Sequence, residues 1–133
     1  MCLKLNGGTV SWSSRKQDIV SLSSMESEYI ALSEACKELQ WVNMIVKSLN
    51  CFSIPKQAIV NTDSQSSMKL MKNQKFSNRS KHVDTKYHYV RNLMENEEIE
   101  LKYCSTEENV ADMMTKPLGT IKLQKFRKDC GLV

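Results

Sequence analysis

The stretch Leu22-Ser-Ser-Met-Glu-Ser-Glu-Tyr-Ile-Ala-Leu-Ser-Glu-Ala35 sets the organisation of this 133-residue chain. It opens with a capping box, in which the Ser23 hydroxyl accepts from first-turn amides while Glu26 reaches back toward the cap. The pattern predicts an amphipathic helix of about seven turns. Its apolar side chains recur at helical spacing, at Leu32, Ala35, Cys36, Leu39, Val42, Val46 and Leu49.

Ahead of this helix the sequence predicts short strands. The runs Cys2–Leu5 and Thr9–Trp12 flank Asn6-Gly-Gly8, whose residues tolerate the positive φ that a tight hairpin turn demands. Asp18–Leu22 alternates in polarity and predicts a third strand immediately before the helix.

After the helix, strands and helices alternate. Ala58–Val60 is a short apolar run of the kind buried in a parallel sheet. Ile99–Tyr103 alternates apolar and polar residues, which predicts a strand with one solvated face. Four helices are expected in this part of the chain. The first runs from about Ser64 to Lys72, and the second is marked by the apolar side chains of Val83, Tyr87, Val90 and Met94. The third begins at Ser105–Glu108 and is stopped by Pro117 and Gly119, and the last is a short helix marked by Leu123, Phe126 and Cys130.

This order of elements, β-β-β-α-β-α-α-β-α-α, predicts an α/β sandwich with a mixed sheet. The sequence contains no repeat, linker or low-complexity tract, so residues 1–133 are expected to form a single domain.

Composition indicates a globular protein of the cell interior. The chain is 41% hydrophobic with a mean hydropathy of −0.44, and no apolar run approaches the roughly 20 residues of a membrane span. Its first residues lack the apolar centre of a signal peptide, so we expect no export and an intracellular location. Five scattered cysteines without a C-x-x-C pair predict reduced thiols, and support neither a disulfide framework nor a zinc site.

The net charge of +4 is unevenly distributed. From Lys69 to Arg91 seven Lys or Arg residues face one acid, Asp84, an excess that favours a polyanionic partner over a merely soluble surface. His82 and His88 are six residues apart and so lie on different sides of a helix, which argues against a metal pair. The side chains expected to contact nucleic acid are Lys69, Lys72, Lys75, Arg79, Lys81, His82, Lys86 and Arg91.

Three acidic residues lie in settings that suit a metal-dependent nuclease. Glu28 shares the helix stripe of Leu32 and Ala35, Asp63 ends the Ala58 strand, and Asp112 lies near the C-terminus. Carboxylates brought together from separate elements can hold two divalent ions, which activate a water and stabilise the leaving oxygen at a phosphodiester.

Each acid also has a structural interpretation. Glu28 could be a partly exposed first-turn glutamate that suits the helix dipole, and Asp63 could be the N-cap of the next helix. Asp112 is expected to lie off the apolar face of its neighbours, where most such residues are simply solvated. Spacing alone leaves these alternatives open.

Five ordered motifs, together covering nearly the whole chain, closely resemble the RNase H domain at the C-terminal end of Pol polyproteins of copia-type LTR retrotransposons. They are Asn6-Gly-Gly-Thr-Val-Ser-Trp-Ser-Ser-Arg-Lys-Gln17, Leu22–Ala35, Thr62-Asp-Ser-Gln65, Ser80-Lys-His-Val-Asp-Thr-Lys-Tyr-His-Tyr-Val-Arg91, and Ser105-Thr-Glu-Glu-Asn-Val-Ala-Asp-Met-Met-Thr-Lys-Pro-Leu118.

The resemblance implies an RNase H-like fold, in which a mixed sheet is flanked by helices. By motif position it implies that Glu28, Asp63 and Asp112 are catalytic and bind two Mg²⁺ or Mn²⁺ ions. The implied substrate is the RNA strand of an RNA–DNA hybrid, whose phosphates the basic segment would grip while reading the shape of the duplex. The parent polyprotein would also carry a reverse transcriptase domain.

The match has one departure. The family has a fourth acid, an Asp on a first, central strand ahead of the hairpin, and no residue of this chain matches it. We therefore expect an incomplete sheet with exposed strand edges, open to self-association. Without one metal ligand, hydrolysis is expected to fall by orders of magnitude.

Two other functions remain open, a non-catalytic nucleic-acid-binding module and a transposon remnant without function. Catalysis predicts metal-dependent cleavage that is lost on Glu28→Gln or Asp63→Asn. Binding alone predicts a salt-sensitive affinity that ignores those substitutions and weakens when the basic residues are neutralised. A remnant predicts neither.

Overall fold

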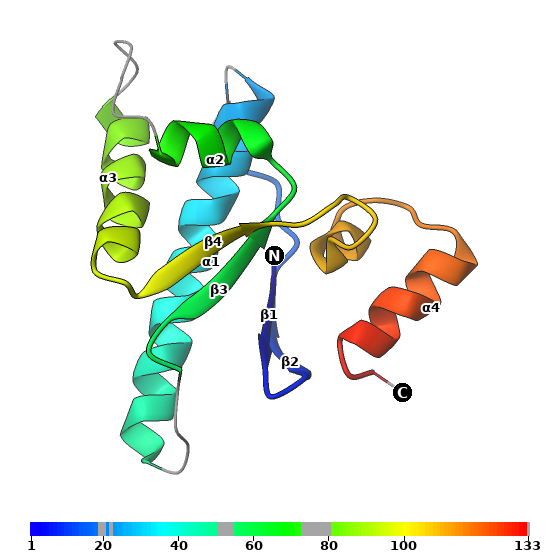
Figure 1. The fold of residues 1–133 in the computed structure, drawn as a ribbon. Coiled ribbons are helices and arrows are strands. Elements are labelled where there is room, and N and C mark those ends of the chain that lie inside the picture. Colours follow the sequence, from blue (N-terminus) through cyan, green and yellow to red (C-terminus); the bar gives the residue numbers. More distant parts are fainter. Residues whose placement is uncertain (19–20, 22, 51–54, 73–80, 133) are drawn as a thin grey trace.

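The computed structural model describes residues 1–18, 21, 23–50, 55–72 and 81–132, without the side chains of 70–72 and 81–84 (Figure 1). The fold is mixed α/β. Its elements are β1 (Cys2–Leu5), β2 (Gly8–Trp12), α1 (Ser24–Leu49), β3 (Ala58–Thr62), α2 (Gln65–Lys72), α3 (Lys81–Glu95), β4 (Ile99–Tyr103), the 3₁₀ helix η1 (Val110–Met114) and α4 (Thr120–Asp129).

The predicted hairpin is confirmed. β1 and β2 pair antiparallel with an irregularity between Leu3 and Lys4. Asn6 and Gly7 have φ values of 50° and 84°, the left-handed conformation that a two-residue hairpin turn requires at both central positions. The third strand expected at Asp18–Leu22 falls largely outside the described residues. Asp18 and Ser21, which are described, are not in a strand.

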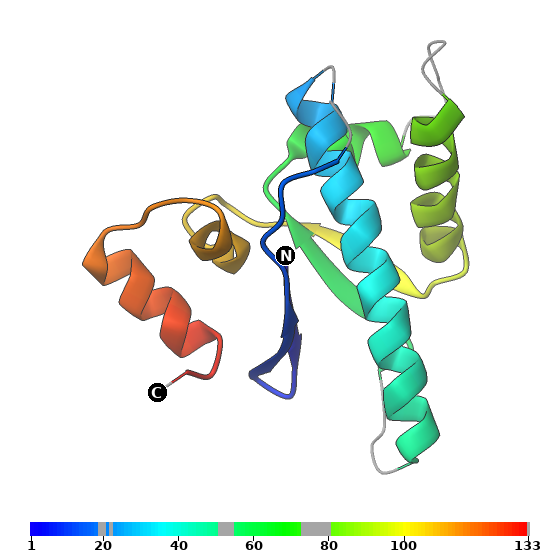
Figure 2. The ribbon, with the colours of Figure 1, turned by 180° about the vertical axis from the view of Figure 1, so that it is seen from behind.

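β3 and β4 pair in parallel, with Ala58 opposite Ile99 and Thr62 opposite Tyr103. In the described part of the chain the strands form two separate two-stranded sheets, where one mixed sheet was expected. The expectation that the β3 run is fully buried is also wrong, because Ile59 is 55% exposed. Helices α1 and α3 pack on one face of this pair, while the face carrying Ile59 lies open (Figures 1 and 2).

The long helix begins where the capping box predicts. Ser23 has an extended backbone and its Oγ accepts from the Glu26 amide at 3.2 Å. At the other end Asn50 adopts a left-handed conformation with φ 52°, a common way for a helix to stop. Figure 2 shows α1 running past both sheets, so a single long element spans the molecule.

The core lies between α1, α3 and β4. Rings of Tyr29 and Tyr87 stack with centroids 5.8 Å apart. Full burial of an apolar side chain contributes about 1.5–3 kcal/mol, so this cluster holds the two helices on the sheet. Its buried members are Tyr29, Leu32, Cys36, Tyr87, Val90, Leu93 and Ile99.

The C-terminal part differs from the prediction in one place. The helix expected to begin at Ser105–Glu108 is a turn, and helical backbone begins only after Asn109, whose side chain caps the Ala111 amide at 3.2 Å. The last helix is confirmed as α4, with Phe126 buried. Among the described residues no helix combines the length and apolar character needed to cross a membrane.

Candidate functional site

Asp63 follows β3 directly, and the structure frees it from the capping role considered above. Ser64 is the cap of α2, because its Oγ accepts from the Ser67 amide at 3.2 Å and pairs with the Ser67 hydroxyl at 2.8 Å. Asp63 instead accepts, through Oδ2, from the Thr106 hydroxyl at 3.2 Å. This bond ties the end of β3 to the turn that follows β4.

Asp112 is buried, with 5% of its surface exposed, so the expectation that it is solvated is wrong. It lies within η1, whose last carbonyl, at Met114, accepts from the Ser14 hydroxyl at 2.6 Å, and this contact holds η1 against the segment after β2. Asp112 Oδ1 pairs with Lys116 Nζ at 2.9 Å. Its Oδ2 is buried with no hydrogen-bond partner among the described residues, which is costly for a carboxylate.

Glu28 is exposed, so the prediction that it points into the core with Leu32 is wrong. The buried stripe of α1 runs through Tyr29, Leu32 and Cys36, because these side chains meet α3. Glu28 lies at the edge of that stripe, where its carboxylate keeps its hydration.

One cation lies under the influence of all three acids. The pKa of the Lys116 ammonium is raised, first by its hydrogen bond to Asp112, then by the negative charges of Asp112, Asp63 and Glu28, while partial burial opposes the shift. These three acids lie on separate elements, α1, the end of β3 and η1, and of the three Asp112 is the one in direct contact with Lys116. Among the residues described, no three His, Cys, Asp or Glu side chains are grouped closely enough to hold a metal ion as they stand.

Cys104 lies in the same region, just after β4. Burial raises the pKa of its thiol, and the charges of Asp63, Glu108 and Asp112 raise it further. Cys104 and Lys116 were not predicted as part of the site. The four-residue spacing between Asp112 and Lys116 is the signal that could have found the lysine, since residues four apart on a helical turn are neighbours.

The predicted nucleic-acid contacts are described only in part. Lys69 is exposed on α2. Lys86 pairs with Glu34 at 3.4 Å and Arg91 with Glu95 at 2.7 Å, so part of the charge on α3 is neutralised within the chain. Lys75 and Arg79 lie outside the described residues, as do the side chains of Lys72, Lys81 and His82.

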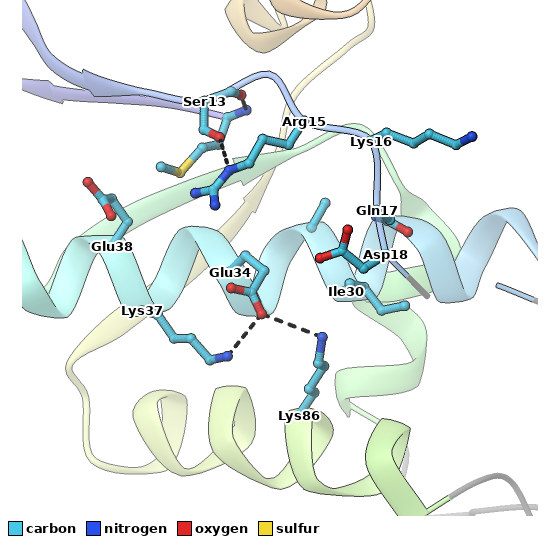
Figure 3. A pocket seen from close by; sticks show the side chains of 12 residues that line it. Ser13, Arg15, Lys16, Gln17, Asp18, Ile30, Glu34, Lys37, Glu38 and Lys86 are labelled. Carbon is cyan, nitrogen blue, oxygen red and sulfur yellow. Dashed lines mark hydrogen bonds and ion pairs between the residues drawn. The ribbon is translucent and has the colours of Figure 1, made fainter. Parts of the chain in front are cut away.

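A cavity of about 430 Å³ lies beside α1, between the segment after β2 and α3 (Figure 3). Lys37 and Lys86 converge there on Glu34, at 2.9 and 3.4 Å, while Asp18 reaches in from the opposite wall. None of the three predicted metal-binding acids lines this cavity. It is a mixed-charge hollow, in which Lys37 and Lys86 are ion-paired with Glu34.

The chain is similar in sequence to Pol polyproteins of transposons. The retrovirus-related Pol polyprotein of transposon TNT 1-94 from Nicotiana tabacum is 37% identical over 96% of the chain, and that of transposon RE2 from Arabidopsis thaliana is 32% identical over 93%. Homologues of this chain are transposon Pol polyproteins. The Gag-Pol polyprotein of transposon Ty1-DR1 from Saccharomyces cerevisiae is 34% identical over 86% of the chain.

The chain spans 9%, 8% and 6% of the lengths of these three relatives, so it corresponds to a small part of each. No protein-family model and no solved structure matches it.

Proposed function

We propose that the chain is an RNase H-like domain of a transposon Pol polyprotein, which hydrolyses the RNA strand of RNA–DNA hybrids. The hairpin, the long helix and the parallel β3–β4 pair support this fold. The observation that carries the proposed activity is the buried Asp112 carboxylate, which keeps one oxygen without a hydrogen-bond partner among the described residues.

The chemistry of the three carboxylates suits a divalent cation, but among the described residues they are not grouped closely enough to hold one as they stand. Carboxylate oxygens are the ligands that Mg²⁺ and Mn²⁺ prefer, and Asp112 keeps one buried oxygen without a partner. Glu28, Asp63 and Asp112 would hold the metal. When bound, two such ions activate a water and stabilise the leaving oxygen of a phosphodiester. The Thr106 hydroxyl orients Asp63, and the turn of η1 keeps Asp112 away from bulk water.

Hybrid binding would come from the basic residues between Lys69 and Arg91. Their charge favours a phosphate backbone without demanding a sequence, as expected for an enzyme that reads the shape of a duplex. A reverse transcriptase domain elsewhere in a Pol polyprotein is the proposed source of the hybrid.

A non-catalytic nucleic-acid-binding module is the alternative function. It is favoured by the ion pair between Asp112 and Lys116, because an ammonium already neutralises the buried acid of the proposed site. No residue of the chain matches the fourth acid that the resemblance implies, so cleavage by this chain alone is expected to be slow.

Cleavage of an end-labelled RNA–DNA hybrid in Mn²⁺ tests the proposal, with Asp63→Asn and Glu28→Gln as the decisive variants. The proposal expects slow cutting of the RNA strand that EDTA and both substitutions abolish. Hybrid binding without cutting, unchanged in both variants and weakened by salt, would replace it with the binding module. Cutting that survives both substitutions would point to a contaminating nuclease.

A further inference from the structure

The C-terminal part of the chain carries a second concentration of positive charge, separate from the stretch between Lys69 and Arg91. From Met113 to Lys128 the sequence has no aspartate or glutamate. A merely solvated helix face usually mixes both signs, so a run of one sign favours a polyanionic partner. The cations of this segment are Lys116, Lys122, Lys125, Arg127 and Lys128, of which the last four lie on α4.

The inner face of α4 uses its charge within the fold. Phe126 is fully buried, and Lys122 lies one turn before it with Nζ 5.5 Å from the centre of its ring. The same ammonium pairs with Glu107 at 3.2 Å. Lys116, ahead of the helix, is likewise paired with Asp112. These two lysines therefore stabilise the packing of the C-terminal part of the chain.

The outer face of α4 presents lysines without a carboxylate partner. Lys125 and Lys128 are three residues apart, so they are neighbours on the helix surface, and both are exposed. Among the described residues neither forms an ion pair with an acid, and Asp129, which ends α4, is partly buried. On α3, by contrast, Lys86 and Arg91 are paired with glutamates. The charge of Lys125 and Lys128 is therefore open to a partner in solution.

The lysines of α4 lie beside the candidate site. Lys125 Nζ donates to the Glu107 carbonyl at 3.4 Å, and Lys122 Nζ donates to the carbonyl one residue earlier at 3.2 Å. α4 thus packs against the turn after β4, in which the Thr106 hydroxyl donates to Asp63 at 3.2 Å. Figures 1 and 2 show α3 and α4 on opposite sides of the molecule, with the β3–β4 pair between them. α4 therefore flanks the candidate site on the side away from α3.

A structural role explains only part of this charge. Cations in the last turn of a helix complement its macrodipole, which accounts for Arg127 and Lys128. The effect falls off within that turn, so it does not account for Lys125, which lies before it.

We propose that the outer face of α4, through Lys125 and Lys128, is a second nucleic-acid-binding surface, which holds the phosphate backbone of the hybrid beside the candidate site. A duplex carries one negative charge about every 1.7 Å of its axis, so two ammonium groups about one helical turn apart can each meet a phosphate. Such contacts fix the position of a duplex without reading its sequence. This inference rests on the proposed function, because it takes the RNA–DNA hybrid as the partner.

The test is binding of a fluorescently labelled RNA–DNA hybrid, followed by anisotropy in EDTA from about 50 to about 200 mM salt. In Lys125→Gln with Lys128→Gln, the slope of log K against log salt should fall in magnitude by about 2, since each lost phosphate contact removes about 1. Over that range the unsubstituted chain should therefore lose about tenfold more affinity than the double variant. Hybrids of unrelated sequence should give the same change.

Lys47→Gln with Lys56→Gln is the matched control, because it removes the same two charges from exposed lysines in the last turn of α1 and just before β3. It should keep the slope within about 0.5 of that of the unsubstituted chain. Lys125→Arg with Lys128→Arg, which keeps both charges, should bind within about twofold of it. Lys128→Gln alone leaves the contact between Lys125 and Glu107 intact and should lower the slope by about 1.

An unchanged slope in Lys125→Gln with Lys128→Gln, with the hybrid still bound, would overturn the inference and leave the proposed function standing. An equal fall in the Lys47 and Lys56 control would also overturn it, because net charge alone would then explain the effect. Absence of hybrid binding by the unsubstituted chain would refute the inference and the proposed function together. Thermal unfolding checks that each variant is folded before it is titrated.

Discussion

The free energy of unfolding of Asp112→Asn tests whether the Asp112 carboxylate is kept for function or stabilises the fold through its ion pair with Lys116. The pair with half-exposed Lys116 is worth at most about 1 kcal/mol, whereas burying the unpartnered Oδ2 costs about 1–3 kcal/mol. Asn keeps the shape of Asp and leaves the backbone bonds to the residue-112 carbonyl intact. Without metal, the substitution is therefore expected to raise the free energy of unfolding by about 1 kcal/mol, and Tm by about 4 °C.

The assay is urea unfolding in EDTA at pH 7, followed by circular dichroism. Glu97→Gln, which neutralises an exposed acid far from the site, should change the free energy of unfolding by less than about 0.5 kcal/mol. A loss of 2 kcal/mol or more in Asp112→Asn would refute the reasoning, because breaking one side of a structural buried pair costs about 3–5 kcal/mol.

Three further predictions concern the scaffold. Burial raises the pKa of the Cys36 thiol from 9.0 to about 12. The unfolded chain therefore loses this proton first, and Cys36 should make stability fall above pH 9 by about 1.4 kcal/mol per pH unit, in addition to the contributions of the other groups whose pKa values are raised. Cys36→Ala should reduce the slope by that amount in urea titrations, and an unchanged slope would contradict the assignment. Gly131→Ala should lower the free energy of unfolding by about 1–3 kcal/mol in the same assay, because the φ of residue 131 is +74° and the new Cβ would lie 3.0 Å from the Gly7 carbonyl oxygen. A decrease of less than about 0.5 kcal/mol would count against this packing. Oxidised glutathione should join Cys2 to Cys130, whose sulfur atoms are 3.8 Å apart, and peptide mapping that finds only glutathione adducts would show that the two ends do not meet.

Local chemistry explains what could be predicted from the sequence. Asn6 and Gly7 accept the positive φ angles that a tight hairpin turn needs, and the Ser23 hydroxyl accepts from an amide that the start of the helix leaves without a backbone partner. Each signal is complete within a few residues, so tertiary contacts did not alter it. The same holds for the alternation in Ile99–Tyr103, which forms β4 as expected.

Errors arose where a side chain depends on elements distant in sequence. Helical spacing placed Glu28 with Leu32, but α3 packs on the side of Tyr29 and leaves Glu28 at the edge. Spacing could not show that Ser64 would cap α2 in place of Asp63, since both residues are good caps.

The burial of Asp112 is the clearest case of a property set by tertiary contacts. Its sequence neighbours predict a solvated acid, yet contacts of η1 with Ser14 and of Asp112 with Lys116 bury the carboxylate. The assignment of the three acids to one site, which the resemblance implies, stays a prediction, whereas the ion pair of Asp112 with Lys116 depends on a distance that only the folded chain supplies.

Paramagnetic broadening by Mn²⁺ tests most directly whether the three acids form one metal site. In a ¹⁵N-labelled sample titrated with substoichiometric Mn²⁺, the account predicts that the amides of Glu28, Asp63 and Asp112 broaden first and together. This broadening should disappear from all three in Asp63→Asn. Broadening that begins instead around Glu34, in the mixed-charge cavity, or that reaches only one of the three acids would contradict the central claim.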